Sequence, residues 1–230
     1  MILIKFFLGI FFLIIIVGVL GLGYLGLIPG LSGLFGSDKP RNLGVHFSTK
    51  DFNSAQTKLN QKFVQATSNP GAQFKSSLGN KVDTVLSQEE YTAHVEKIHP
   101  VSDMQVKFDG STFEMSGRID KSRIPQFART WGITNASDAE ILNVVNKYYP
   151  GDPIFYLKGT GGAKNNDLQI NVTKAELGRL PVPQDQAAKA VELYTETLFN
   201  SVPGFYVEES SIDNGKLHFK GSTVNEVPMY

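Results

Sequence analysis

Two histidines and a glutamate near residue 95 carry the side chains that most often bind metal ions or move protons. His94, Glu96 and His99 fall in a segment with a helical pattern. Because an α-helix turns by about 100° per residue, two imidazoles five positions apart point about 140° away from each other. Metalloprotease histidines are four positions apart and share one face. We therefore interpret these histidines as solvated residues near a helix end, and we predict no metal site.

Two glycine-rich segments are the other places where the residue types suggest chemistry. The stretch from Gly159 to Lys164 lacks the P-loop spacing and no helix follows it, so it predicts a hairpin loop. The stretch from Gly30 to Gly33 lacks the spacing of a nucleophile elbow. The absence of cysteine excludes disulfides, thiol catalysis and Cys-ligated zinc. We predict a protein that is not an enzyme, with no cofactor and no catalytic residue; the ligand-binding residues are unknown from sequence.

Charge is distributed very unevenly along the chain. Residues 1–37 carry one charged side chain, Lys5, whereas the rest of the chain has 21 basic side chains (22 in all, less Lys5) and 22 acidic ones. A nucleic-acid-binding domain carries a basic excess, so this balance argues against nucleic acid as a partner.

The segment from Phe6 to Ile28 contains no charged residue and is dense in Ile, Leu, Val and Phe. As a helix it spans about 34 Å, enough to cross a hydrocarbon core of about 30 Å. A cleavable signal peptide is the alternative, but its apolar run is usually shorter, about 7–15 residues, and a cleavage site follows it. We predict a single-pass anchor in the cell membrane. The flanking charges do not decide the topology, and the composition favours a C-terminal domain outside the cytoplasm.

These patterns divide the chain into three parts. Residues 1–36 form the transmembrane anchor and a Gly-rich neck, which we expect to be flexible after Ile28. Residues 37–48 form a linker, and residues 49–230 form an extracytoplasmic domain. A domain of this size buries enough surface to fold without a metal or a disulfide.

Apolar residues alternate between a helical period and a strand period within this domain. Asp109-Gly110 and Asp213-Asn214-Gly215 predict tight hairpin turns, and Ser87 with Glu90 predicts a capping box. Helices are expected over 50–66 (ended by Ser68-Asn69-Pro70-Gly71), from 88 to the residue before Pro100, within 121–149 and over 184–201; strands are expected over 81–86, 104–108, 113–119, 154–159, 168–172, 205–210 and 216–222. The fold class is α+β: an antiparallel, curved sheet with amphipathic helices packed on one face.

The order of elements from Leu86 onward resembles small bacterial membrane-anchored proteins related to the tubular lipid-binding (TULIP) superfamily. The residues that carry the resemblance are Leu86-Ser87-Gln88-Glu89-Glu90, the Asp109-Gly110 hairpin, Leu177-Gly178-Arg179-Leu180-Pro181-Val182-Pro183 and Val202-Pro203-Gly204-Phe205. The resemblance implies a long helix wrapped by a curved sheet, with an apolar groove for lipid acyl chains. The helical insert over 121–149 departs from that pattern, and the superfamily supplies no motif-bound functional residues.

Two functions fit these observations. The first is non-enzymatic binding of lipid or another apolar ligand close to the membrane that holds the anchor. The second is a structural or protein-interaction module of the cell envelope, with a solid core and no ligand cavity. A continuous apolar space between the sheet and the helix over 184–201 distinguishes them.

Overall fold

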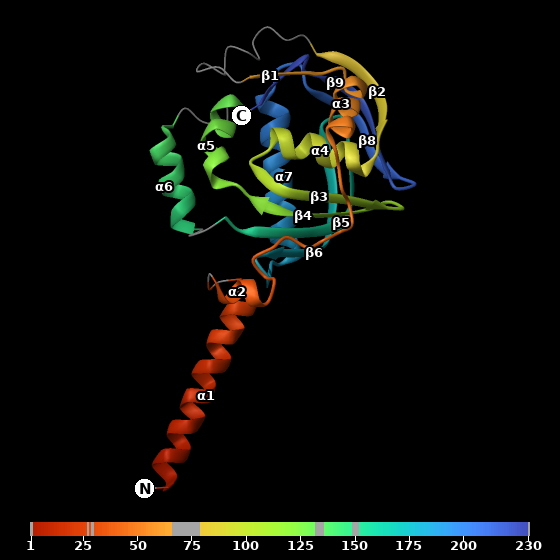
Figure 1. Cartoon of the computed structure of the whole chain (residues 1–230). Coiled ribbons are helices and arrows are strands. Elements are labelled where there is room, and N and C mark those ends of the chain that lie inside the picture. The colour runs from red at the N-terminus through yellow and green to blue at the C-terminus, as the bar shows by residue number, and fades with distance from the viewer. Residues whose placement is uncertain are drawn as a thin grey trace.

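The computed structural model describes residues 2–26, 28, 30–65, 79–131, 136–148 and 152–229; the side chains of residues 2–12, 65, 148, 228 and 229 are not among those described. Its elements in chain order are α1 (Ile2–Tyr24), α2 (Leu31–Leu34), α3 (Thr49–Lys58), β1 (Lys62–Gln65), β2 (Asn80–Leu86), α4 (Gln88–Ile98), β3 (Val101–Asp109), β4 (Thr112–Ile119), η3 (Lys121–Arg123), α5 (Ile124–Thr130), α6 (Asp138–Tyr148), β5 (Ile154–Lys164), β6 (Asp167–Leu177), β7 (Leu180–Pro181), α7 (Gln184–Ser201), β8 (Tyr206–Asp213), β9 (Lys216–Thr223) and β10 (Glu226–Met229). Figure 1 shows α1 projecting away from the remaining elements.

The main sheet is antiparallel and follows the order β2-β9-β8-β5-β4-β3, with β6 pairing with β5 and β7. Strand β5 has different neighbours along its length, because residues 154–160 pair with β4 and residues 162–164 pair with β8. The sheet curves around the helices (Figure 1). A second, small sheet pairs β1 with β10 in parallel. The predicted α+β class with an antiparallel sheet is therefore confirmed.

The hairpin turns are confirmed by residues with positive φ. Gly110 turns β3 into β4, and Asn214 and Gly215 turn β8 into β9. The predicted loop at Gly159–Lys164 is wrong, because these residues continue strand β5 and the turn lies at Asn165 and Asn166. Glycine is accommodated inside this strand because neighbouring backbones approach closely: a Cβ at Gly162 would lie 2.4 Å from the carbonyl oxygen of Ser210.

The first helix of the domain is shorter than predicted. Helix α3 ends at Lys58, and Asn60 then adopts a left-handed φ of 50°, which terminates the helix. Phe63, which falls within the helix expected over 50–66, lies in β1 instead, and the N-cap of α3 is Ser48. The predicted helix stop at residues 68–71 lies outside the described residues. By contrast, the capping box of Ser87 and Glu90 and the bounds of α7 are confirmed.

Three helices pack on one face of the sheet. Val95 of α4 is buried against side chains of β3, Ala55 of α3 against β2, and Ala187 of α7 against β6. Leu157 packs against both the α4 cluster and the α7 cluster. Because Leu157 projects from one side of β5, α4 and α7 share that side of the sheet.

Helix α1 begins in the apolar N-terminal segment, and its side chains are described from Leu13 onward. Among the described residues, no helix is both long and apolar enough to cross a membrane. The large apolar side chains of α1 from Leu13 to Leu22 are exposed to the surroundings.

Candidate functional site

Helix α7 is attached to the domain mainly at its two ends. Near its start, Ala187 is buried against Val172 and Ala175 of β6. At its end, Leu198 packs against a second cluster that includes the buried Val202. These are separate clusters. Val191 lies between them on the same face of the helix and, among the described residues, belongs to neither cluster. Along this stripe Ala187 is buried, Val191 and Leu198 are half-buried, and the stripe is therefore only partly covered.

Tyr194 occupies the next position of that stripe and is 42% exposed. Its ring stacks on Phe127 of α5, with ring centroids 6.3 Å apart, and its hydroxyl lies 2.6 Å from Nδ1 of His99. It thus links the outer edge of the helix to α4 and α5. An apolar ring with a polar tip at such a boundary is suited to a site that is partly wet.

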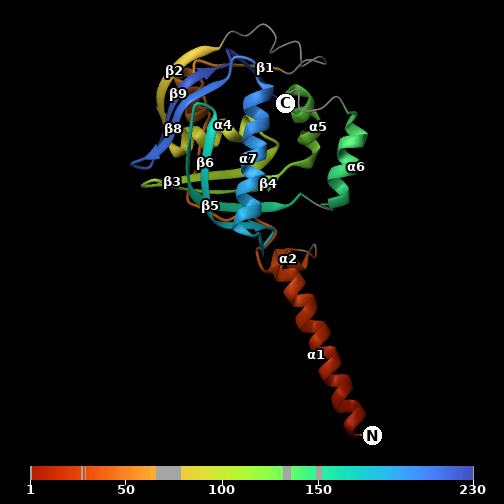
Figure 2. The same ribbon diagram turned by 180° about the vertical axis from the view of Figure 1, so that it is seen from behind.

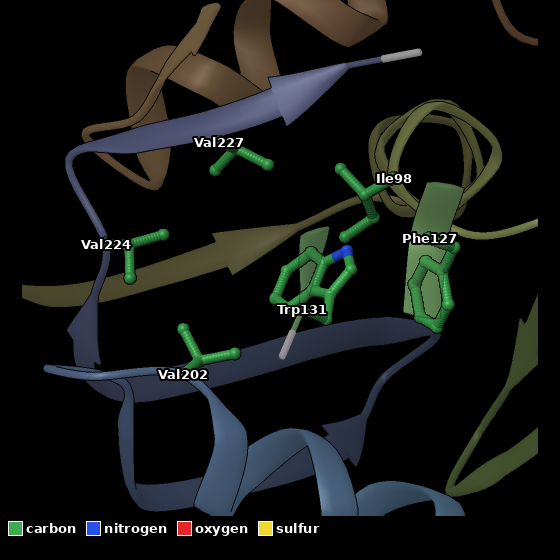
Figure 3. Close-up of a cluster of buried hydrophobic side chains, with 6 residues drawn as sticks. All are labelled: Ile98, Phe127, Trp131, Val202, Val224 and Val227. Atoms are coloured by element: carbon green, nitrogen blue, oxygen red, sulfur yellow. The ribbon is translucent and has the colours of Figure 1, made fainter. Parts of the chain in front are cut away.

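The cluster at the C-terminal end of α7 is built from five elements or their flanks. Figure 3 shows the Trp131 indole between Ile98 and Phe127 on one side and the valines on the other. The buried members are Ile98, Phe127, Trp131, Val202, Val224 and Val227. Phe63 and Phe205 pack against it from β1 and from the start of β8. This end of the domain is rich in aromatic rings, and the buried members of the cluster that the structure describes are all uncharged.

The histidines singled out in the sequence lie beside this cluster rather than in open solvent. His94 Nε2 is 2.8 Å from Oε1 of Gln61, and burial lowers the pKa of His94 to about 4. Burial, with smaller contributions from His94 and from the Arg123 guanidinium, lowers the pKa of His99 to about 3. Both imidazoles are therefore neutral at neutral pH.

Glu96 accepts a hydrogen bond from the start of β3. Its Oε2 accepts a hydrogen bond of 2.8 Å from the backbone N–H of Met104, next to Asp103, which has a positive φ. The carboxylate thus supports an irregular start of β3. Within the described ranges, no three His, Asp or Glu side chains gather in a way that could hold a metal ion.

The opposite face of the sheet carries a polar cluster that the sequence patterns did not indicate. Arg41 donates to both carboxylate oxygens of Glu176 on β6, at 2.7 Å each, and its guanidinium lies 4.6 Å from the centroid of the Tyr156 ring. Tyr156 donates a hydrogen bond of 2.6 Å to Glu114. Burial and this hydrogen bond raise the pKa of Tyr156. Burial alone would raise the pKa of Glu176, but Arg41 and Lys174 outweigh it and lower that pKa.

This cluster fixes the linker to the sheet. The backbone N–H of Arg41 donates to Ser116 on β4, and those of Leu43 and Val45 donate to Oε1 of Gln105 on β3. Side chains also hold the preceding residues, because Arg118 donates to the carbonyl oxygen of Asp38. Residues 38–45, called the strap below, therefore cross the outer face of the sheet as a bonded segment.

The start of the neck contacts the end of β6 through Leu25 and Gly26. Gly26 has a φ of 83°. A Cβ at Gly26 would lie 3.0 Å from the carbonyl oxygen of Ser37 and 3.9 Å from the Cα of Gly178, which follows β6. Arg179 donates from its backbone to Leu25 and from its side chain to the carbonyl oxygen of Lys39. Gly26 therefore permits a close backbone approach, whereas a Cβ at Gly30 or Gly36 would meet no described atom within 4 Å. The flexibility expected after Ile28 stays a prediction.

No protein-family model matches this chain, and no curated protein or solved structure is similar enough to count as a match. The resemblance to the tubular lipid-binding superfamily stays a prediction from the order of elements and from turn residues.

Proposed function

We propose that this chain is a single-pass membrane protein, anchored through Phe6 to Ile28, whose α+β domain binds a lipid or another apolar ligand outside the cytoplasm. The ligand lies along the middle of α7, between the two buried clusters at the ends of that helix. The observation that carries this proposal is the incomplete cover of the α7 stripe at Val191 and Tyr194.

Physical chemistry makes such a stripe a binding surface. Each Å² of apolar surface removed from water contributes about 25 cal/mol, so a helix normally buries its whole apolar stripe. Helix α7 buries Ala187 and leaves Val191 and Leu198 partly exposed. An acyl chain placed against these side chains supplies the missing cover, and the Tyr194 hydroxyl and His99 provide a polar end near it.

The anchor is supported by the sequence and by the place of α1. The uncharged run from Phe6 to Ile28 is long enough to cross a bilayer, and the described side chains of α1 from Leu13 onward are exposed instead of packed on the domain. Figure 2 shows the helix leaving the domain from the side where α2 lies. An anchor of this kind keeps the α7 face close to the membrane in which apolar ligands dissolve.

Photolabelling of the full chain in its own membrane tests both halves of the proposal. A fatty acid that carries a diazirine is supplied, crosslinked by light, and mapped to peptides by mass spectrometry. We expect label in α1 and, separately, in the α7 peptide around Val191. Val191→Glu places a charge on the proposed binding surface and should lower the α7 label about tenfold. This corresponds to a loss of about 1.4 kcal/mol in binding free energy. Gln186→Glu adds the same charge at an exposed position of α7 and should leave the label unchanged.

The outcomes separate the two functions considered. Label in α1 without label in α7 would contradict ligand binding and favour a structural or protein-interaction module. Label in neither helix would contradict the anchor as well. Sidedness is read from Lys216→Cys in the exposed β8–β9 turn region, which a membrane-impermeant maleimide should modify in intact cells because the chain has no other cysteine.

A further inference from the structure

The junction between α1 and the domain exposes three large apolar side chains. Tyr24, at the end of α1, is 60% exposed; Leu34 and Phe35, at the end of α2, are 81% and 44% exposed. We call these three residues the collar. Monomeric soluble surfaces rarely gather large apolar side chains in this way without a partner.

The collar is held in place by the fold of the chain around it. Helix α2 turns back onto α1 so closely that a Cβ at Gly23 would lie 2.5 Å from the Leu31 side chain. The Ser37 hydroxyl donates a hydrogen bond of 2.8 Å to the carbonyl oxygen of Gly23. The rings of Tyr24 and Phe35 meet edge to face, with centroids 6.1 Å apart. The exposed side chains therefore belong to a packed turn, not to a frayed helix end.

The same turn is bonded to the end of β6. The backbone N–H of Arg179 donates to the carbonyl oxygen of Leu25 at 3.2 Å, and the Arg179 side chain donates to Gly36 at 3.3 Å. Leu180, the first residue of β7, is exposed beside this contact. The collar and the β6–β7 turn thus form one unit, and a surface that holds the collar also orients the domain.

We propose that the collar inserts into the boundary between the headgroups and the acyl chains of the membrane that holds α1, and that this contact fixes the domain in one orientation with the β6–β7 turn toward the lipid. The inference rests on the anchor of the proposed function. The lipid surface is the occupant because the collar directly continues the exposed apolar surface of α1, whose Leu20 and Leu22 are exposed one turn or less before Tyr24. Tyr at the end of an apolar helix, with Lys39 beyond it, has the order of residues found at a membrane interface.

Single cysteines in this cysteine-free chain test the proposal at four depths. Ile16→Cys, Leu34→Cys, Leu180→Cys and Lys216→Cys replace exposed side chains, so none removes a buried contact. Each full-length variant is labelled with an environment-sensitive fluorophore and placed in phosphatidylcholine–phosphatidylglycerol vesicles that carry spin-labelled lipids. We expect the Leu34 label to be quenched by a spin label near the headgroup, the Ile16 label by one deep in the acyl chain, the Leu180 label by the headgroup probe alone, and the Lys216 label by neither.

Each other result overturns a defined part of the inference. If the label at Ile16→Cys is quenched while the label at Leu34→Cys is as little quenched as that at Lys216→Cys, the collar does not enter the membrane although the anchor does. If Leu34 is quenched while Leu180 matches Lys216, the orientation of the domain is wrong. If Ile16 itself is unquenched, the anchor fails, and with it the proposal that depends on it. Ligand binding at α7 is read by photolabelling and is independent of all three results.

Discussion

The strap and α7 are both laid across the sheet, on opposite faces, and they are held by different forces. The strap is fixed by directional bonds, from the backbone of Arg41 to Ser116 and from its guanidinium to Glu176. Helix α7 rests on apolar contacts at Ala187 and at Leu198, joined by the hydrogen bond of Tyr194. Directional bonds to charged groups specify one geometry, whereas apolar contacts accept partners of similar shape. The strap is thus suited to hold an orientation, and α7 to exchange one apolar neighbour for another.

The two regions also lie differently relative to α1. The strap follows the neck directly and lies at the end of the domain from which α1 leaves (Figure 1). The aromatic cluster lies at the other end of α7, with Trp131 and Val202.

The largest expected effect contrasts a phenylalanine of the aromatic cluster at the end of α7 with one of the collar, next to the strap. Phe127→Ala empties space inside the buried cluster beside Trp131 and should lower the free energy of unfolding by about 3–5 kcal/mol. Phe35→Ala removes an exposed ring in the collar and should cost less than about 1 kcal/mol. Urea unfolding of the full chain in lipid nanodiscs, followed by fluorescence of the single Trp131, measures both. Equal losses would mean that the neck is as much part of the core as the aromatic cluster.

Acid should destabilise the surroundings of His94 and His99, beside α7, and those of Glu176, under the strap, in different ranges of pH. The lowered pKa values of His94 and His99 mean that the unfolded chain binds more protons below about pH 6.5, so stability falls as the pH drops from 6.5 toward 4. The lowered pKa of Glu176 contributes stability that is lost only below its usual value of 4.5. We expect a loss of about 2 kcal/mol between pH 6.5 and 4.5, less than the full shifts imply because both rings keep some exposed surface.

The variant that tests this assignment is His94→Gln, which should flatten the upper part of the pH dependence. His46→Gln, at an exposed position of the linker, is the control and should leave the curve unchanged. A profile that is flat down to pH 4.5 in the unaltered chain would show that the histidines remain solvated, as the sequence alone indicated.

The regular part of the fold was predictable because its signals are local. Alternating residues on both sides of Gly110 predict a hairpin, and the stripe of α7 predicts a helix whose bounds the structure reproduces. The parallel pairing of β1 with β10 was not predictable, since it joins Lys62 to Glu226 across most of the chain. The helix expected over 50–66 was wrong at Phe63 for the same reason: a long-range strand pairing prevailed over a local pattern.

The candidate site likewise has features with a local sequence signal and features that depend on long-range contacts. The apolar stripe of α7 was visible in the sequence, but its partial cover at Val191 depends on the spacing of two separate clusters. Arg41 gave no signal, because its partner Glu176 is 135 positions away along the chain. Gly26 makes a close backbone contact with Ser37 that only the folded chain reveals.

Removing the strap's main ion pair should have a moderate effect on stability and a larger one on local opening. Arg41→Ala leaves Glu176, 9% exposed, with Lys174 as its remaining partner; because the arginine itself is 37% exposed, we expect a loss of about 1–2 kcal/mol. Amide exchange at Leu43 and Val45 should become about tenfold faster for each 1.4 kcal/mol of lost local stability. Lys50→Ala, at an exposed position of α3, is the control. Unchanged exchange at both amides would mean that Gln105 alone holds the strap.

The smallest expected effect tests whether the polar link of α7 adds to its apolar contacts. Tyr194→Phe keeps the ring on Phe127 and removes the 2.6 Å contact with His99, so the free energy of unfolding should fall by about 1 kcal/mol. Tyr206→Phe is a matched control: Tyr206 is 41% exposed, and its hydroxyl donates to Asn165 in a solvent-exposed turn, where water replaces the lost bond. It should cost less than about 0.5 kcal/mol. If the two substitutions cost the same, the Tyr194 hydroxyl is solvated too, and α7 is held to α4 by packing alone.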